Sequence, residues 1–148
     1  MDLFADTKNA KTAVFYSRYR CPGASGTNAF SVPWTCMVAW ICPPVTKIPE
    51  VVKRIVRSEQ LTGVLVIPVW QTAVFWPFIS PDGIHVTECF GKVVSFRPFI
   101  IQGETNDCKN LLRGFTPFPF LALYITNAGK GCIRAGKIRL PAEALAQT

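Results

Sequence analysis

The chain has 148 residues, 49% of them hydrophobic, and a net charge of +7 from 16 Lys and Arg against 9 Asp and Glu. This length suits one domain with a sizeable core, and the apolar composition excludes an intrinsically disordered chain. The positive residues are spread from Lys8 to Arg139 and form no dense run. The charge therefore fits a DNA partner, whose phosphates attract cations, as well as it fits an ordinary solvated surface.

The cysteine and histidine residues bear on metal binding and on the cellular compartment. The six cysteines form no CxxC pair, and the single histidine, His85, has no partner at metal-ligand spacing, so we expect no metal site. No charged segment followed by a long apolar run opens the chain. We therefore expect a nuclear or cytoplasmic protein and not a secreted one, with cysteines that are reduced and mostly buried.

In chain order, residues 37–42 form the first clear strand, and their apolar character predicts a central strand covered on both faces. After Pro43 and Pro44, apolar residues recur at helical spacing, which predicts an amphipathic helix over about 47–59, capped by Thr46. The apolar positions are Ile48, Val51, Val52, Ile55 and Val56, and the solvent-side positions are Lys47, Glu50, Lys53, Arg54 and Arg57.

The stretch GVLVIPVWQTAVFWPFI, residues 63–79, is interrupted by Pro68, Gln71 and Pro77. A membrane-spanning helix needs about 20 mostly apolar residues, so we expect no membrane partner. A buried strand over 63–68, entered through Gly63, and then a short helix explain the stretch better. With the helix before it, this strand predicts a parallel strand-helix-strand crossover.

Further along, we expect a helix within 72–79, a turn into a strand over 80–86, and strands over 92–101 and 120–126. The order predicts an α/β domain over 1–126, with an open sheet whose C-terminal part is antiparallel or irregular. Residues 127–148 are basic and broken by glycines, so we expect a loosely held extension.

Four blocks of sequence carry a family resemblance: DLFADTKNAKTAVFYSRYRCPGASGTNAFSVPW, AWICPPVTKIPEVVKRIV, GVLVIPVWQTAVFWPFISPDG and LLRGFTPFPFLALYI. In order and spacing they resemble the Dam-like methyltransferase region of DIRS-type retrotransposon polyproteins, which is similar in turn to phage-type DNA adenine N6-methyltransferases. The resemblance covers about residues 2–126. It implies a Rossmann-like methyltransferase sheet, S-adenosylmethionine as cofactor, DNA as substrate, and other segments of a mobile-element polyprotein as partners.

The family's Asn-Pro-Pro-Tyr or Asn-Pro-Pro-Phe motif appears here as Cys42, Pro43, Pro44 and Val45. A thiol accepts hydrogen bonds from a target amine far more weakly than an amide oxygen, and valine offers no ring for a base to stack on. The two changes together cost roughly 2 to 6 kcal/mol, or about 30-fold to over 10⁴-fold in rate. The prolines also fit a purely architectural role, ending a strand and aiming a helix. As a nucleophile, Cys42 would lack a base, because nothing in the sequence places His85 beside it.

By the same resemblance, Asp2, Asn9 and Asn28 are expected on the cofactor side. Asp2 also fits a solvated acid, and the two asparagines also fit turn or cap residues. The family's Asp-Ala-Phe block begins here with Asn28, there is no Gly-rich cofactor loop, and no apolar strand precedes Asp2. We therefore expect the sheet to be incomplete at its N-terminal edge.

The sequence is compatible with two functions. The leading hypothesis is a non-catalytic, mobile-element-derived domain that keeps the methyltransferase fold and binds no cofactor. The other is a working DNA adenine N6-methyltransferase that uses S-adenosylmethionine with an altered motif. If the domain meets DNA, we expect Lys53, Arg54 and Arg57 to contact phosphates from the outer side of their helix, close to the motif loop. The alternative is a solubilising helix face.

Overall fold

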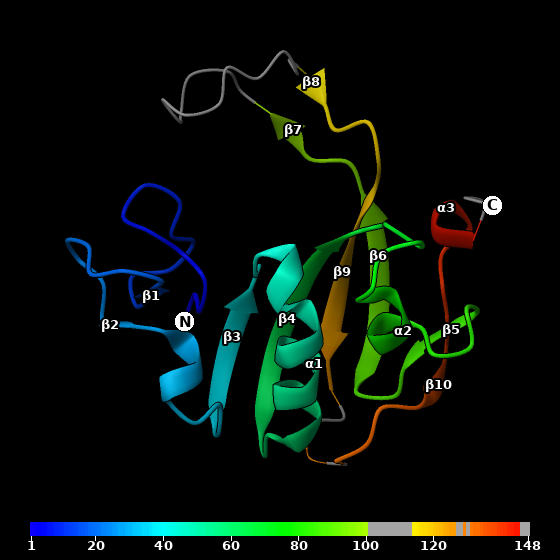
Figure 1. Cartoon of the computed structure of the whole chain (residues 1–148), viewed down its shortest axis with the longest axis horizontal. Helices are drawn as coiled ribbons and strands as arrows, with labels where there is room; N and C mark the ends of the chain where they lie inside the picture. The colour runs from blue at the N-terminus through cyan, green and yellow to red at the C-terminus, as the bar shows by residue number, and fades with distance from the viewer. Residues whose placement is uncertain (101–113, 127–128, 130, 146–148) are drawn as a thin grey trace.

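The computed structural model describes residues 1–100, 114–126, 129 and 131–145, and its centre is a four-stranded sheet (Figure 1). The strands are β1 (Tyr16–Ser17), β2 (Gly26–Thr27), β3 (Met37–Ile41), β4 (Leu61–Pro68), β5 (His85–Thr87), β6 (Phe90–Phe96), β7 (Phe99–Ile100), β8 (Gly114–Phe115), β9 (Phe120–Ile125) and β10 (Ala135–Arg139). The helices are α1 (Ile48–Arg57), α2 (Trp76–Ile79) and α3 (Ala142–Leu145), with 3-10 turns η1 (Ala29–Ser31) and η2 (Val45–Lys47).

The central sheet has the strand order β3-β4-β9-β6. β3 and β4 are parallel, in register from Met37 opposite Leu61 to Ile41 opposite Leu65, and α1 connects them. The predicted strand-helix-strand unit with adjacent parallel strands is confirmed. β9 runs antiparallel to both β4 and β6, so the C-terminal half of the sheet is mixed, as expected for an α/β domain.

Glycine allows β3 and β4 to approach closely at one point. Gly63 has φ +139°, and a Cβ built there would lie 1.9 Å from the backbone oxygen of Ala39. Only a residue without a side chain fits this conformation and this spacing. The prediction that Gly63 opens the strand was wrong by two residues, because β4 begins at Leu61.

The apolar stripe of α1 is fully buried, as its spacing predicts: Ile48, Val51, Val52, Ile55 and Val56 are all at most 2% exposed. The predicted cap was wrong. Thr46 lies inside η2, and the helix begins after Lys47 without a side-chain cap. Pro49, in the first turn, needs no amide partner there, which makes this start favourable.

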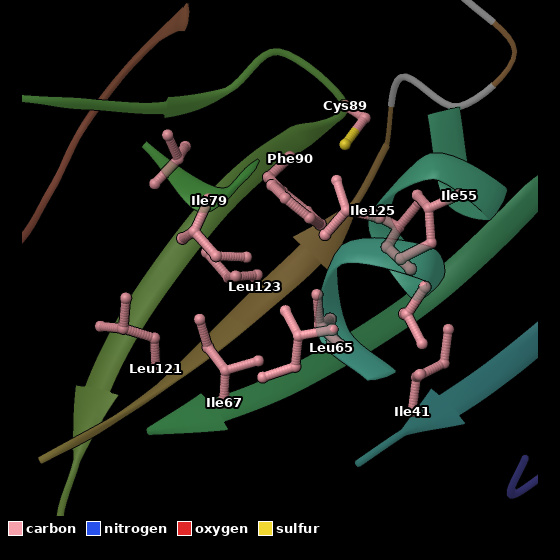
Figure 2. Close-up of a cluster of buried hydrophobic side chains, with 14 of the residues drawn as sticks. Ile41, Ile55, Leu65, Ile67, Ile79, Cys89, Phe90, Leu121, Leu123 and Ile125 are labelled. Carbon is pink, nitrogen blue, oxygen red and sulfur yellow. The ribbon is translucent and has the colours of Figure 1, made fainter. Parts of the chain in front are cut away.

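One face of the sheet carries the core. α1 and α2 lie over this face, which we call the helical face (Figure 1). In Figure 2, side chains from β4 and β9, among them Leu65 and Leu123, point toward Ile55 of α1 and Ile79 of α2, and all four are fully buried. Burying a leucine or isoleucine side chain contributes about 1.5–3 kcal/mol, so this layer supplies much of the stability of the domain.

The opposite face, which we call the open face, was not expected. Val38 of β3 is 71% exposed, and Val94, Phe96 and Tyr124 are also exposed, although Val66 at the centre is buried. Strand residues alternate between the two faces, and within the described residues α1 and α2 lie over one face. The prediction that residues 37–42 are covered on both faces was therefore wrong.

At the β3 edge, the N-terminal residues continue the sheet. Asp2 is bridged in parallel to Trp40 on one side and to Phe15 on the other, and the Leu3 amide donates to the Trp40 carbonyl at 3.1 Å. β1 and β2 are parallel to each other and lie beyond this segment. A short parallel array thus occupies the edge where we expected the sheet to be incomplete.

We expected residues 127–148 to be a loosely held extension, but the described residues of this segment pack against the domain. β10 pairs antiparallel with β5, and Leu140 and Ala144 are buried in the hydrophobic core. The expected helix within 72–79 shrinks to the four residues of α2, and the expected strand over 92–101 divides into β6 and β7, with Ile101 outside the described residues. In the described part of the chain, no helix has both the length and the apolar character to cross a bilayer.

Candidate functional site

The altered motif lies at the carboxyl end of β3. Cys42 is the first residue after the strand, Pro43 is buried, and Pro44 directly precedes η2. Val45 begins η2 and packs, half-buried, against the core. The two prolines turn the chain from β3 into η2 and α1, so their architectural role is visible in the fold.

Cys42 is exposed at this turn, which corrects the expectation of a buried residue. Most of the other described cysteines are not buried either, since only Cys89 is. Desolvation by the surrounding chain raises the pKa of the Cys42 thiol, the Asp2 carboxylate raises it further, and Lys11 opposes them. A thiol with a raised pKa stays protonated at neutral pH and is a poor nucleophile and a weak acceptor.

His85 is engaged elsewhere. Its Nδ1 lies 2.8 Å from Oδ2 of Asp82, in a turn before β5. His85 is not among the groups that shift the pKa of Cys42. The structure thus supplies no evidence for a Cys-His nucleophile, and within the described residues no three His, Cys, Asp or Glu side chains gather as metal ligands.

Of the predicted cofactor residues, Asp2 is bridged to Trp40, two residues before Cys42, and its carboxylate raises the pKa of the Cys42 thiol. It is 2% exposed, which excludes the alternative of a solvated acid. Its Oδ1 accepts a hydrogen bond from the Phe4 amide at 3.3 Å, and its Oδ2 accepts one from the Lys11 amide at 2.9 Å. The carboxylate therefore holds the turn after residue 5 against the sheet.

The two asparagines serve separate local turns. The Asn9 side-chain oxygen accepts from the Asp6 amide at 2.7 Å, and the Asn28 side-chain oxygen accepts from the Phe30 amide at 3.2 Å. Asn28 has φ +59° and caps η1, a left-handed conformation that asparagine tolerates well. Both side chains behave as turn and cap residues.

Arg54 does not project into solvent as its helix position predicts. Its guanidinium donates to the carbonyl oxygens of Phe30 (3.1 Å) and Val32, and lies 5.5 Å from the ring centre of Trp34. Trp34 is 1% exposed and donates from Nε1 to the Ala29 carbonyl at 2.9 Å. Arg54 therefore joins the segment around η1 to α1, a tertiary contact that helical periodicity cannot reveal.

Lys53 and Arg57 do lie exposed on α1. The expectation that the basic trio lies close to the motif loop needs correction, because Arg54 and Arg57 are in the last turn of α1. A ten-residue helix is about 15 Å long, and the motif loop precedes its first turn. Arg57 therefore does not form one site with the altered motif, whereas Lys53 lies in the middle of the helix.

Sequence reasoning missed a run of aromatic side chains on the open face. Ring centres of Trp70 and Phe118 are 5.2 Å apart, those of Phe118 and Phe120 are 5.6 Å apart, and those of Phe120 and Phe96 are 6.1 Å apart. Further along β9, the Lys92 ammonium lies 5.3 Å from the ring centre of Tyr124. The alternation of these rings with buried leucines in FPFLALYI was the available signal.

Comparison of the chain with protein-family models, with curated proteins and with solved structures gives no match. The interpretation of the site therefore depends on its geometry and on the resemblance that the sequence blocks carry.

Proposed function

We propose that this chain is a non-catalytic, methyltransferase-like domain of mobile-element origin that contacts nucleic acid. The observation that carries the proposal is the strand order. The N-terminal segment, β3 and β4 run parallel, and β9 is inserted antiparallel between β4 and β6. Parallel strands joined by a helix, followed by an antiparallel C-terminal part, are the arrangement that the sequence and its resemblance predict. This agreement supports the resemblance independently of the motif residues.

The chemistry at the end of β3 favours a domain without methyl transfer. A target amine needs a strong acceptor at the position of Cys42 and a stacking ring at the position of Val45. The raised pKa keeps the thiol neutral, and Val45 is half-buried against the core. The roughly 2 to 6 kcal/mol that the missing acceptor and the missing ring cost together would leave transfer badly impaired.

The residues expected to hold S-adenosylmethionine do not fit that role. The Asp2 carboxylate is buried and uses both oxygens for backbone amides, and Asn9 and Asn28 accept from amides of their own turns. Redirecting the Asp2 carboxylate to ribose hydroxyls would leave the part-buried amides of Phe4 and Lys11 without partners, at about 1–3 kcal/mol each. This competition supports a domain that has kept the architecture and lost the cofactor.

Calorimetry with S-adenosylmethionine tests the non-catalytic proposal. We expect no saturable heat of binding for the chain. The variant that restores the motif, Cys42→Asn with Val45→Tyr, should also transfer no methyl group to an adenine-containing duplex, because the cofactor residues are engaged elsewhere. Saturable binding of the cofactor, or methyl transfer by this variant, would instead support a working DNA adenine N6-methyltransferase.

The proposed binding of nucleic acid is tested on the two exposed cations of α1, Lys53 and Arg57. We expect Lys53→Glu with Arg57→Glu to weaken binding to duplex DNA and to reduce its salt dependence, by about 0.9 in the slope of log K against log salt for each phosphate that is no longer neutralised. The matched control, Lys137→Glu with Arg139→Glu, changes the charge equally on exposed positions of β10. Equal duplex affinity for the two variants would contradict a specific role for α1.

A further inference from the structure

The open face gathers apolar side chains that no described helix covers. Val38, Trp70, Val94, Phe96 and Tyr124 are five of the nine large hydrophobic residues that are exposed in the described part of the chain. Strand pairing puts Val94, Phe96 and Tyr124 on the same face of β6 and β9. Trp70 joins this group through its ring contact with Phe118, and Val38 lies on β3, separated from β9 by β4. Contiguous exposed apolar surface of this kind marks an interaction site more often than isolated exposed residues do.

A β-bulge brings a cation onto this apolar surface. Phe90 pairs with Ile125 and points into the core, whereas Lys92 pairs with Tyr124, and the register shifts between them at Gly91. Without the bulge, strand alternation would put positions 90 and 92 on the same face. The extra residue therefore turns Lys92 onto the open face, in the way that bulges re-aim side chains at functional sites.

The four strands of the central sheet carry charge of one sign. The sequences of β3, β4, β6 and β9 contain no Asp or Glu, and Lys92 is their one charged residue. With a net charge of +7 on the chain, this surface complements a polyanion.

We propose that the open face binds single-stranded nucleic acid, with bases stacked on Phe96 and Tyr124 and a phosphate held by Lys92. Phe120 and Tyr124 are four residues apart on β9, about 13 Å, so the aromatic run beside Phe96 and the ring of Tyr124 form two separate platforms. Stacking platforms beside cations are the means by which proteins bind single strands without reading sequence. The partner class rests on the proposed function, but the surface is distinct from the cations of α1.

Fluorescence anisotropy with three labelled probes tests this inference: oligothymidylate, oligouridylate of equal length, and the duplex of oligothymidylate with its complement. We expect both single strands to bind more tightly than the duplex. Phe96→Leu with Tyr124→Leu keeps the apolar character and removes the rings, so affinity for single strands should fall about tenfold or more. Lys92→Gln should reduce the salt slope for single strands by about 0.7.

Phe78→Leu is the matched control, because the Phe78 ring also has a lysine ammonium, that of Lys53, 5.4 Å from its centre, but belongs to α2. It should leave single-strand affinity unchanged. Circular dichroism and thermal melting must show that the variants fold. Wild-type affinity of the Phe96 and Tyr124 variant for both single strands would overturn the inference, and so would preferential binding of the duplex.

Light scattering tests whether a second copy of the chain, and not nucleic acid, occupies the open face. A dimer that dissociates in the Phe96 and Tyr124 variant, without a change in single-strand affinity, would assign the open face to self-association and overturn the inference. If the proposed function is wrong, the chain binds S-adenosylmethionine, or the two cation variants bind duplex DNA with equal affinity. Neither result depends on how the chain binds single strands.

Discussion

The two faces of the central sheet are built from the same strands and differ in almost every physical respect. On the helical face, Leu121, Leu123 and Ile125 of β9 are at most 2% exposed and pack under α1 and α2. On the open face, Phe120 and Tyr124 of the same strand are partly exposed and lie among other rings and a lysine. This difference indicates that the helical face stabilises the domain, whereas the open face is available for binding a partner.

Substituting Gly63 should have the largest effect, because it breaks the strand pair on which both faces depend. The Cβ of Gly63→Ala would lie 1.9 Å from the Ala39 oxygen at φ +139°. We expect a loss of more than about 4 kcal/mol in the free energy of unfolding, measured by denaturant titration. The control, Gly83→Ala, also has positive φ but nothing within 4 Å, and should cost about 1–2 kcal/mol. Equal losses would mean that the close approach is unimportant.

Substitutions at two neighbouring residues of β9 test the difference between the helical face and the open face. Leu123→Ala removes a fully buried side chain from the helical face and should cost about 3 kcal/mol, while Tyr124→Ala, on a residue 37% exposed, should cost less than about 1 kcal/mol. Chemical denaturation of both variants gives the difference directly. A larger loss for Tyr124→Ala would show that the open face is covered in the folded domain.

Two arginines of the last turn of α1 sharpen the distinction between structural and surface charge. Arg54→Ala removes hydrogen bonds to Phe30 and Val32 and should cost about 2 kcal/mol, since hydrogen bonds from charged donors contribute about 1.5–3 kcal/mol. Arg57→Ala should change stability by no more than about 0.5 kcal/mol. Thermal melting of the two variants checks this, and similar melting temperatures would remove the structural role of Arg54.

Thiol alkylation should show the smallest effect, a difference in rate. Hydrogen bonds from Ser17 and Thr7 lower the pKa of Cys21, desolvation and Asp2 raise that of Cys42, and desolvation raises that of Cys89 to about 12. A lower pKa gives more thiolate at a given pH. Among these three thiols, peptide mapping at mildly alkaline pH should find Cys21 modified first, then Cys42, and Cys89 last. Modification of Cys42 before Cys21 would contradict this assignment.

Local patterns in the sequence predicted the elements whose signals lie within one segment. The spacing from Ile48 to Val56 predicted α1 and its buried stripe, and the apolar runs predicted β3, β4 and β9 with nearly correct ends. Contacts between distant segments were beyond the same reasoning. The pairing of residues 1–3 with β3 and the bonds from Arg54 to the segment before β3 depend on tertiary packing, which periodicity does not encode.

The candidate site was predicted less well for a related reason. The position of Cys42 at the end of β3 followed from the strand pattern, but its exposure and the engagement of Asp2 by backbone amides depend on how the N-terminal turn folds over the sheet. The open face was missed because continuous apolar runs predict burial on both sides, and only the placement of the helices decides which side stays uncovered.

The insertion of β9 between β4 and β6 also constrains how the domain is made. β9 follows both neighbours in the chain, so a nascent chain that has not reached Phe120 carries β4 and β6 with facing edges unpaired, two strand spacings or about 10 Å apart. Unpaired strand edges are templates for association with other chains. Synthesis must therefore pass residue 125 before the sheet can close, and chains that end earlier should aggregate where the full chain folds.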